Sequence, residues 1–190
     1  MKNCYIITLF LIILFSAGCK ENDYRLSTEI QVYEFVFNEI IRDATKEILI
    51  ENTFNADYLK DKKLEDLSNH FEELNQFPIN LLERVIDSSD VQEDINWTPI
   101  MVNAQFIDLK ALNEENPNRI NFWKAFKQEH PNHIGYYHIS KAQIDYQNNE
   151  ALVLVGYKCP ALCGAHDTLI WVRKEGNFWS IVKASMFYFT

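Results

Sequence analysis

One strand-like segment constrains the fold of this chain more than any other. Residues 151–157 read Ala-Leu-Val-Leu-Val-Gly-Tyr, and both alternating sets of side chains are apolar, Leu152 and Leu154 against Val153 and Val155. A strand with two apolar faces is covered on both of them. The segment is therefore predicted to lie centrally in a β-sheet, with helices or an oligomeric partner on each side.

The segments around this strand predict an antiparallel meander in the C-terminal part of the chain. Alternating patterns and short polar turns indicate strands over residues 134–146, 151–158, 168–174 and 178–189. Three consecutive short connections favour antiparallel pairing of neighbouring strands. Two earlier apolar segments, residues 46–53 and 100–109, are candidates to extend this sheet.

Helical periodicity dominates the remaining chain. Apolar residues at spacings of three and four predict helices over residues 28–44, 57–77, 80–86 and 119–129. Residues 113–118 are predicted to be a turn-rich connection. The expected fold is α+β, one domain over residues 27–190. In it an antiparallel β-meander of about four to five strands is packed by the N-terminal helix and by the central helix around Trp123.

The start of the chain has the layout of a bacterial lipoprotein signal. Lys2 supplies a positive charge, residues 5–15 are apolar except Thr8, and small residues precede Cys19. The apolar run is shorter than the ~20 residues that cross a bilayer. We therefore expect residues 1–18 to be removed, Cys19 to carry lipid such as palmitate, and residues 19–26 to form a short tether. This predicts a lipid-anchored protein on the periplasmic or surface face of the cell envelope.

The acidity of the chain limits its partners. The formal net charge is −9, and it becomes −10 once the segment with Lys2 is removed. Phosphate binding needs clustered basic residues, whereas the densest basic group, Lys60, Lys62 and Lys63, is interleaved with acidic ones. A nucleic-acid partner is therefore not expected, and membrane attachment depends on Cys19 alone.

Two cysteines, Cys159 and Cys163, remain after Cys4 leaves with the signal and Cys19 is acylated. In an oxidising compartment outside the cytoplasm they are candidates for one disulfide. Its loop is short, so closing it contributes only about 2 kcal/mol. Such a bridge would hold a loop in place rather than the whole fold.

Two other interpretations of this loop stay open. With His166, the cysteines are weak candidates for a metal site, but structural zinc needs four ligands and no fourth is identifiable. In a thiol-redox site Cys159 would attack and Cys163 would resolve, although the spacing is one residue longer than in Cys-x-x-Cys and strands flank the loop. The structural disulfide is favoured, and no metal or cofactor is expected.

The other candidate titratable side chains form two groups. One is a set of histidines: His130, His133 and His138. Because the last two are an odd number of positions apart, an extended strand would point them to opposite faces, and all three are predicted to be surface or loop residues. The other is a set of carboxylates: Asp61, Glu65, Glu72 and Glu73. These are predicted to form the solvated face of a helix rather than an acid–base pair.

The C-terminal third combines an aromatic run at 122–126, the strand at 151–157, the Cys159-x-x-x-Cys163-Gly164 loop and the Gly-Asn-Phe-Trp turn at 176–179. In these features it resembles a family of uncharacterised, Bacteroidota-like secreted or lipid-anchored proteins. In that family an aromatic helix precedes a β-meander, and the cysteine loop links two strands. The resemblance covers about residues 118–190 and implies an architecture but no reaction.

Missing motifs shape the functional prediction. The mature chain has four glycines too far apart for a phosphate-binding loop, and it lacks Gly-x-Ser-x-Gly and His-Glu-x-x-His. The sequence therefore predicts a membrane-anchored, non-enzymatic binding or protein-interaction module of unknown ligand. Two alternatives stay open: a small envelope enzyme or thiol-redox protein using the Cys159–Cys163 loop, and an anchored immunity-type protein that binds a toxin.

Overall fold

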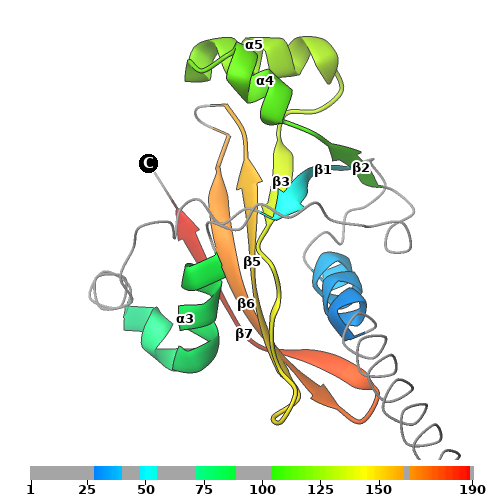
Figure 1. Cartoon of the computed structure of the whole chain (residues 1–190), viewed down its shortest axis with the longest axis vertical. Helices are drawn as coiled ribbons and strands as arrows, with labels where there is room; N and C mark the ends of the chain where they lie inside the picture. The colour runs from blue at the N-terminus through cyan, green and yellow to red at the C-terminus, as the bar shows by residue number, and fades with distance from the viewer. Residues whose placement is uncertain (1–27, 40–47, 55–71, 89–103, 161–162, 189–190) are drawn as a thin grey trace, which may run out of the picture.

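The computed structural model describes residues 28–39, 48–54, 72–88, 104–160 and 163–188 (Figure 1). Their core is a seven-stranded sheet of order β2-β1-β3-β5-β6-β7, in which β4 also pairs with β5. The strands are β1 (Ile48–Phe54), β2 (Ala104–Ile107), β3 (Tyr136–Ile139), β4 (Gln143–Asp145), β5 (Glu150–Lys158), β6 (His166–Glu175) and β7 (Phe178–Tyr188). The helical elements are residues 28–39, η2 (Glu72–Gln76), α3 (Ile79–Asp87), α4 (Lys110–Glu115) and α5 (Arg119–Glu129).

The central strand β5 is covered on both faces, as predicted. Val153 and Val155 share a buried cluster with helix 28–39. Leu152 and Leu154 share another with α3, which lies on the other side of the sheet (Figure 1). Burying each of these side chains contributes about 1.5–3 kcal/mol, so the two clusters fix the orientation of β5 in the sheet.

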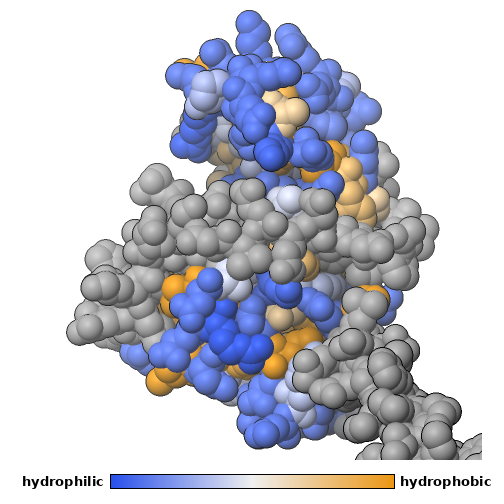
Figure 2. Space-filling view, in the orientation of Figure 1, coloured by the Kyte–Doolittle hydropathy of each residue, from blue (hydrophilic) through white to orange (hydrophobic). Residues whose placement is uncertain are grey.

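The third cluster lies at one end of the sheet, where α4 and α5 pack (Figure 1). Phe122 and Phe126 of α5 contact the side of the sheet that carries Leu49 of β1 and Ile107 of β2. Figure 2 shows that the outer surface of this end is mainly hydrophilic. Phe122 and Phe126 of α5 are therefore turned toward the strands.

The predicted antiparallel meander of four to five strands is wrong for the sheet as a whole. β5, β6 and β7 do form antiparallel hairpins, but β1 pairs in parallel with both β2 and β3. The result is a mixed sheet of seven strands, although the α+β class holds. Short turns force antiparallel neighbours, whereas the long connections between β1, β2 and β3 permit parallel ones. The apolar content of residues 46–53 and 100–109 indicated two additional strands but not the direction in which they run.

A β-bulge divides the segment predicted as one strand over residues 134–146. Ile139 pairs with Val155 and Gln143 with Leu152, so this side of the ladder holds one extra residue. Ser140 sits at the break. Its N–H donates to the Leu154 carbonyl over 2.8 Å, and its Oγ accepts from the Leu154 N–H over 2.9 Å. The serine hydroxyl thus replaces a ladder carbonyl.

The helices agree with the predictions at α5, which spans residues 119–129, and at α3, which begins one residue before the predicted range. The connection predicted at 113–118 begins inside α4. The predicted signal, Cys19 and the tether lie outside the described residues, as does most of the helix predicted over 57–77. Of the helices described, none has the length and apolarity needed to span a bilayer.

Replacing Ser140 with Ala should lower the free energy of unfolding by about 1–3 kcal/mol, because the buried Leu154 N–H loses its acceptor. Urea denaturation followed by tryptophan fluorescence measures this change. Ser180→Ala is the matched control, since its hydroxyl is exposed and donates to the Arg173 carbonyl at 3.3 Å. Equal effects of the two variants would show that the bulge does not depend on the serine side chain.

Candidate functional site

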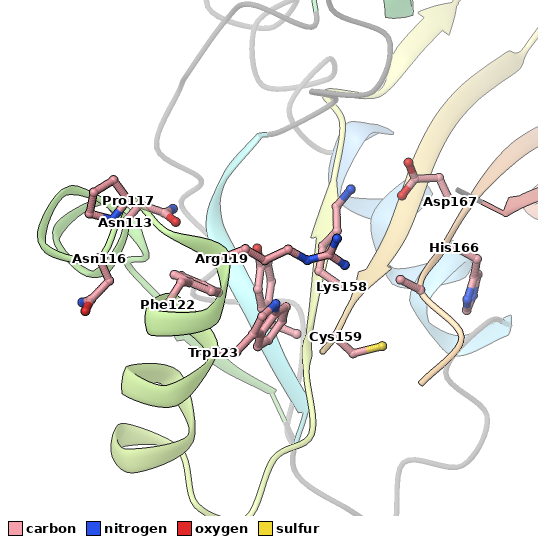
Figure 3. A pocket seen from close by; sticks show the side chains of 12 residues that line it. Asn113, Asn116, Pro117, Arg119, Phe122, Trp123, Lys158, Cys159, His166 and Asp167 are labelled. Carbon is pink, nitrogen blue, oxygen red and sulfur yellow. The ribbon is translucent and has the colours of Figure 1, made fainter. Parts of the chain in front are cut away.

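A pocket of about 420 Å³ opens between the start of α5 and the adjoining ends of β5 and β6 (Figure 3). We call it the α5 pocket. It is lined by Asn113, Asn116, Pro117, Arg119, Phe122, Trp123, Tyr136, Lys158, Cys159, Ala165, His166 and Asp167. Its helix side is therefore polar and aromatic, and its strand side carries charged residues.

The helix side is positioned by the N-cap of α5. Asn118 Oδ1 accepts from the Ile120 N–H at 2.9 Å, which starts the helix and places Arg119 in its first turn. Trp123 follows one turn later and is held among other rings. Its centroid lies 5.1 Å from Phe122, edge to face, and 5.9 Å from Tyr136. The aromatic wall of the pocket is thus fixed by packing.

The strand side is built over Gly156. In the register of the sheet, this glycine lies between His138 of β3 and Asp167 of β6. Because glycine has no side chain, His138 Nε2 and Asp167 Oδ1 meet across β5 at 3.0 Å. A Cβ atom at position 156 would overlap both side chains. Glycine is required at position 156 because the side chains of its two cross-strand neighbours touch there, and not because of its backbone angles.

The His138–Asp167 pair is buried, with exposed fractions of 2% and 1%. Burial raises the pKa of Asp167, but the contact with His138 and the charges of His138, Lys158 and His166 outweigh it and hold this pKa below its usual value. Asp167 is therefore ionised at neutral pH. Its Oδ2 has no hydrogen-bond partner among the described residues and, like Oδ1, is closed to solvent. Asp167 therefore contributes negative charge to the pocket wall rather than an accessible acceptor.

Two basic residues line the pocket together with this carboxylate. Figure 3 shows Arg119 reaching from α5 toward the end of β5, where Lys158 lies, with Trp123 beneath it and Asp167 on the far side. Arg119 is exposed and Lys158 is half-buried. In the part of the chain that the structure describes, neither forms an ion pair with an acidic residue. The pocket therefore presents more positive than negative charge.

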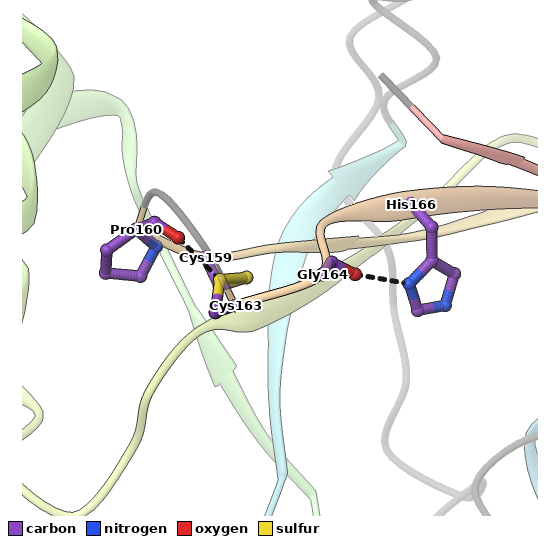
Figure 4. The surroundings of a disulfide bond; sticks show 5 residues. All are labelled: Cys159, Pro160, Cys163, Gly164 and His166. Atoms are coloured by element: carbon purple, nitrogen blue, oxygen red, sulfur yellow. Dashed lines mark hydrogen bonds between the residues drawn. A yellow bond between two sulfur atoms is a disulfide. The ribbon is translucent and has the colours of Figure 1, made fainter. Parts of the chain in front are cut away.

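A disulfide joins Cys159 and Cys163, whose Cα atoms are 6.1 Å apart (Figure 4). Cys159 is buried in the pocket wall, whereas Cys163 is exposed. His166 Nδ1 lies 2.8 Å from the Gly164 carbonyl oxygen, so this nitrogen donates and the loop backbone orients the ring. With both sulfurs in the bridge, no thiolate is present for a metal. No group of three or more His, Cys, Asp or Glu side chains among the described residues is arranged to hold one.

None of the other predicted residues within the described part of the chain lines the α5 pocket. His130 and His133, 6.4 Å apart between ring centroids, are half-buried at the end of α5. The prediction of a surface or loop position is wrong for His138, because the space above Gly156 lets this side chain enter the core. Glu73 in η2 is exposed, as predicted, and Asp61 and Glu65 lie outside the described residues. Glu72 begins η2.

Three residues of the pocket were not predicted from the sequence: Asp167, Arg119 and Lys158. Asp167 has a signal in the sequence, because it lies in a β-strand next to a Leu-Ile run while the central strand carries one glycine among bulky residues. A lone glycine in a strand often marks close approach of other groups. Arg119 and Lys158 have no such signal, since their meeting depends on how α5 packs on the sheet.

No protein family, curated protein or solved structure matches this chain. The resemblance to an envelope family therefore stays a prediction. What the structure defines is a class: an α+β protein with a mixed seven-stranded sheet and a charged, aromatic-walled pocket at one end of it.

Replacing Gly156 with Ala should lower the free energy of unfolding by about 3–5 kcal/mol, because the methyl group separates the buried Asp167 carboxylate from its contact with His138. Chemical denaturation measures the loss. Gly176→Ala is the control: a Cβ there meets open space and adds only the strain of a positive φ, about 1–2 kcal/mol. A Gly156→Ala variant as stable as the control would refute the steric role of this glycine.

Proposed function

We propose that this chain is a lipid-anchored protein of the cell envelope that acts as a non-enzymatic binding module, with the α5 pocket as its binding site. The anchor is supported by the lipoprotein-like pattern that ends at Cys19. The binding role is supported by the structure of the pocket. An anchored receptor of this kind would hold its ligand close to the membrane, because the tether before the domain is short.

The observation that carries the binding role is the pair of basic side chains in the pocket wall. Arg119 and Lys158 come from different elements, and neither forms an ion pair with an acidic residue among the described residues. Such side chains can form charge-assisted hydrogen bonds with a ligand.

The pocket is also held in shape before any ligand binds. Its strand side belongs to a hydrogen-bonded ladder, its helix side begins at a capped turn, and its loop is closed by a disulfide. Because these walls need not reorganise when a ligand binds, less conformational entropy is lost on binding. Among the lining residues there is no serine, threonine or free thiol for His166 to activate as a nucleophile, which favours binding over covalent catalysis.

A thiol-redox role is the second candidate, favoured by the exposure of Cys163. A partner thiolate that attacks this sulfur would form a mixed disulfide and release Cys159 as a thiol in the pocket wall. The flanking strands and the burial of Cys159 favour the structural role instead. A Cys159→Ser, Cys163→Ser double variant that keeps its ligand would support binding over redox activity.

The anchor is tested by replacing Cys19 with Ala in the full-length protein. Incorporation of an alkyne-tagged palmitate, detected after cell growth, should fall to background because the acylated residue is lost. Cys4→Ala is the matched control and should label like the wild type, since residue 4 lies in the removed segment. Undiminished labelling of Cys19→Ala would show that the lipoprotein assignment is wrong.

The binding role is tested by site-specific photo-cross-linking of the full-length protein in its own envelope. Benzoylphenylalanine in place of Asn116, a half-buried pocket residue, should give a discrete adduct on irradiation, detected by intact mass. The same group in place of Phe178, which is 80% exposed on β7, is the control and should give none. The same adducts at both positions, or none at 116, would contradict a binding role for this pocket.

A further inference from the structure

We propose that the ligand of the α5 pocket is a monocarboxylate with an apolar body, such as an aryl or short alkyl acid. This inference rests on the proposed function and names the chemical class of its ligand. It is carried by two adjoining cavities, one basic and one apolar, that share Trp123 as a wall.

The apolar cavity has a volume of about 380 Å³, and we call it the Ile134 groove. Its exposed wall is almost wholly apolar, and it is lined by Trp123, Lys124, Phe126, Lys127, Ile134 and Pro160. The Lys127 ammonium donates to the carbonyls of Pro131 and His133, so the loop backbone holds this charge. Ile134 is 64% exposed, and a ligand that covers it removes apolar surface from water.

The two cavities follow one stripe of α5. Its side chains recur at spacings of three and four residues, which places them on one face of a helix. They are Arg119, Phe122 and Trp123, which line the α5 pocket, and Trp123, Phe126 and Lys127, which line the groove. Directly after β5, the consecutive residues Cys159 and Pro160 line the pocket and the groove in the same order. One ligand can therefore contact both cavities.

The basic cavity calls for a single negative charge. Arg119 and Lys158 have no acidic partner among the described residues, and a guanidinium binds a carboxylate through two parallel hydrogen bonds. Asp167 is the only carboxylate that lines either cavity, and both of its oxygens are closed to solvent. Its charge opposes a second negative charge on the ligand, but its oxygens cannot bind an ammonium group. The ligand is therefore a monoanion rather than a dianion or a zwitterion.

The helix sets the distance between the charge and the apolar body. Arg119 and Trp123 are one turn apart, so their Cα atoms are separated by about 6 Å along the helix axis. Trp123 is half-buried and lines both cavities. An apolar group on the ligand can lie against this ring if it begins a few bonds from a carboxylate held by Arg119. A benzene ring joined to a carboxylate through a short alkyl chain, as in 3-phenylpropionate, meets this requirement.

The experiment measures binding of 3-phenylpropionate to the full-length protein in detergent by isothermal titration calorimetry. 3-Phenylpropanol lacks the charge, acetate lacks the apolar body and phenylalanine adds an ammonium group, so each should bind at least about 10-fold more weakly. N-acetylphenylalanine separates two sources of the same chemistry. Tighter binding of this compound than of 3-phenylpropionate would assign the C-terminal residue of a peptide, and weaker binding would assign a free acid.

Each cavity offers an exposed residue to replace and a matched control. Arg119→Ala should weaken binding of 3-phenylpropionate by about 10-fold or more, whereas Lys110→Ala, which removes an exposed charge from α4 outside both cavities, should change it by less than about twofold. Ile134→Ala should weaken it by about 5-fold, whereas Ile120→Ala should change it by less than about twofold, because Ile120 is 78% exposed and lines neither cavity. Since these side chains are all exposed, the variants should fold like the wild type.

Several outcomes would overturn the ligand class. Binding of 3-phenylpropanol as tight as that of 3-phenylpropionate would show that the basic residues do not read charge. Equally tight binding of acetate, or equal effects of Ile134→Ala and Ile120→Ala, would show that the groove does not contribute. Phenylalanine binding as tightly would show that the site accepts an ammonium group. No binding of 3-phenylpropionate, together with an adduct at position 116, would reject the ligand class while leaving the binding function in place.

Discussion

One end of the sheet depends on a single side-chain contact, between His138 and Asp167 across Gly156. It joins the two neighbours of the central strand, β3 and β6, through side chains on one face. Removing two polar groups from water is costly, and their attraction offsets this only when they stay in contact. This contact requires a glycine in the middle strand and goes together with one register of the three strands.

The β-bulge at Ser140 belongs to the same arrangement. Without the extra residue, one regular strand would continue from β3 into β4 beside β5. With it, the two strands keep separate registers, and His138 and Gln143 are both buried. A bulge lets one strand serve two parts of a core, since it changes the alternation of side chains once along its length. The hydroxyl of Ser140 satisfies the backbone group that the break exposes.

The parallel part of the sheet supports the helix that forms one side of the pocket. Long connections place β1 and β2 next to β3, and Leu49 and Ile107 of these strands receive the aromatic face of α5. That contact sets the helix at the end of the sheet, with its first turn beside the ends of β5 and β6. Arg119 on the helix side of the pocket and Asp167 on its strand side are 48 residues apart in the sequence. A purely antiparallel meander would leave α5 without this support.

The sequence by itself determined the central position of β5, the extents of α3 and α5, and the cysteine pair, because each depends on local periodicity or on residue type alone. It also predicts the lipid anchor, which its first residues carry. Only the tertiary structure decided the direction of β1 and β2, the burial of His138 and the meeting of Arg119, Lys158 and Asp167. The direction of a strand depends on the connections before and after it. The space beside a glycine is filled by whichever side chains the strand register places next to it. These are long-range relations, and no local pattern of residues encodes them.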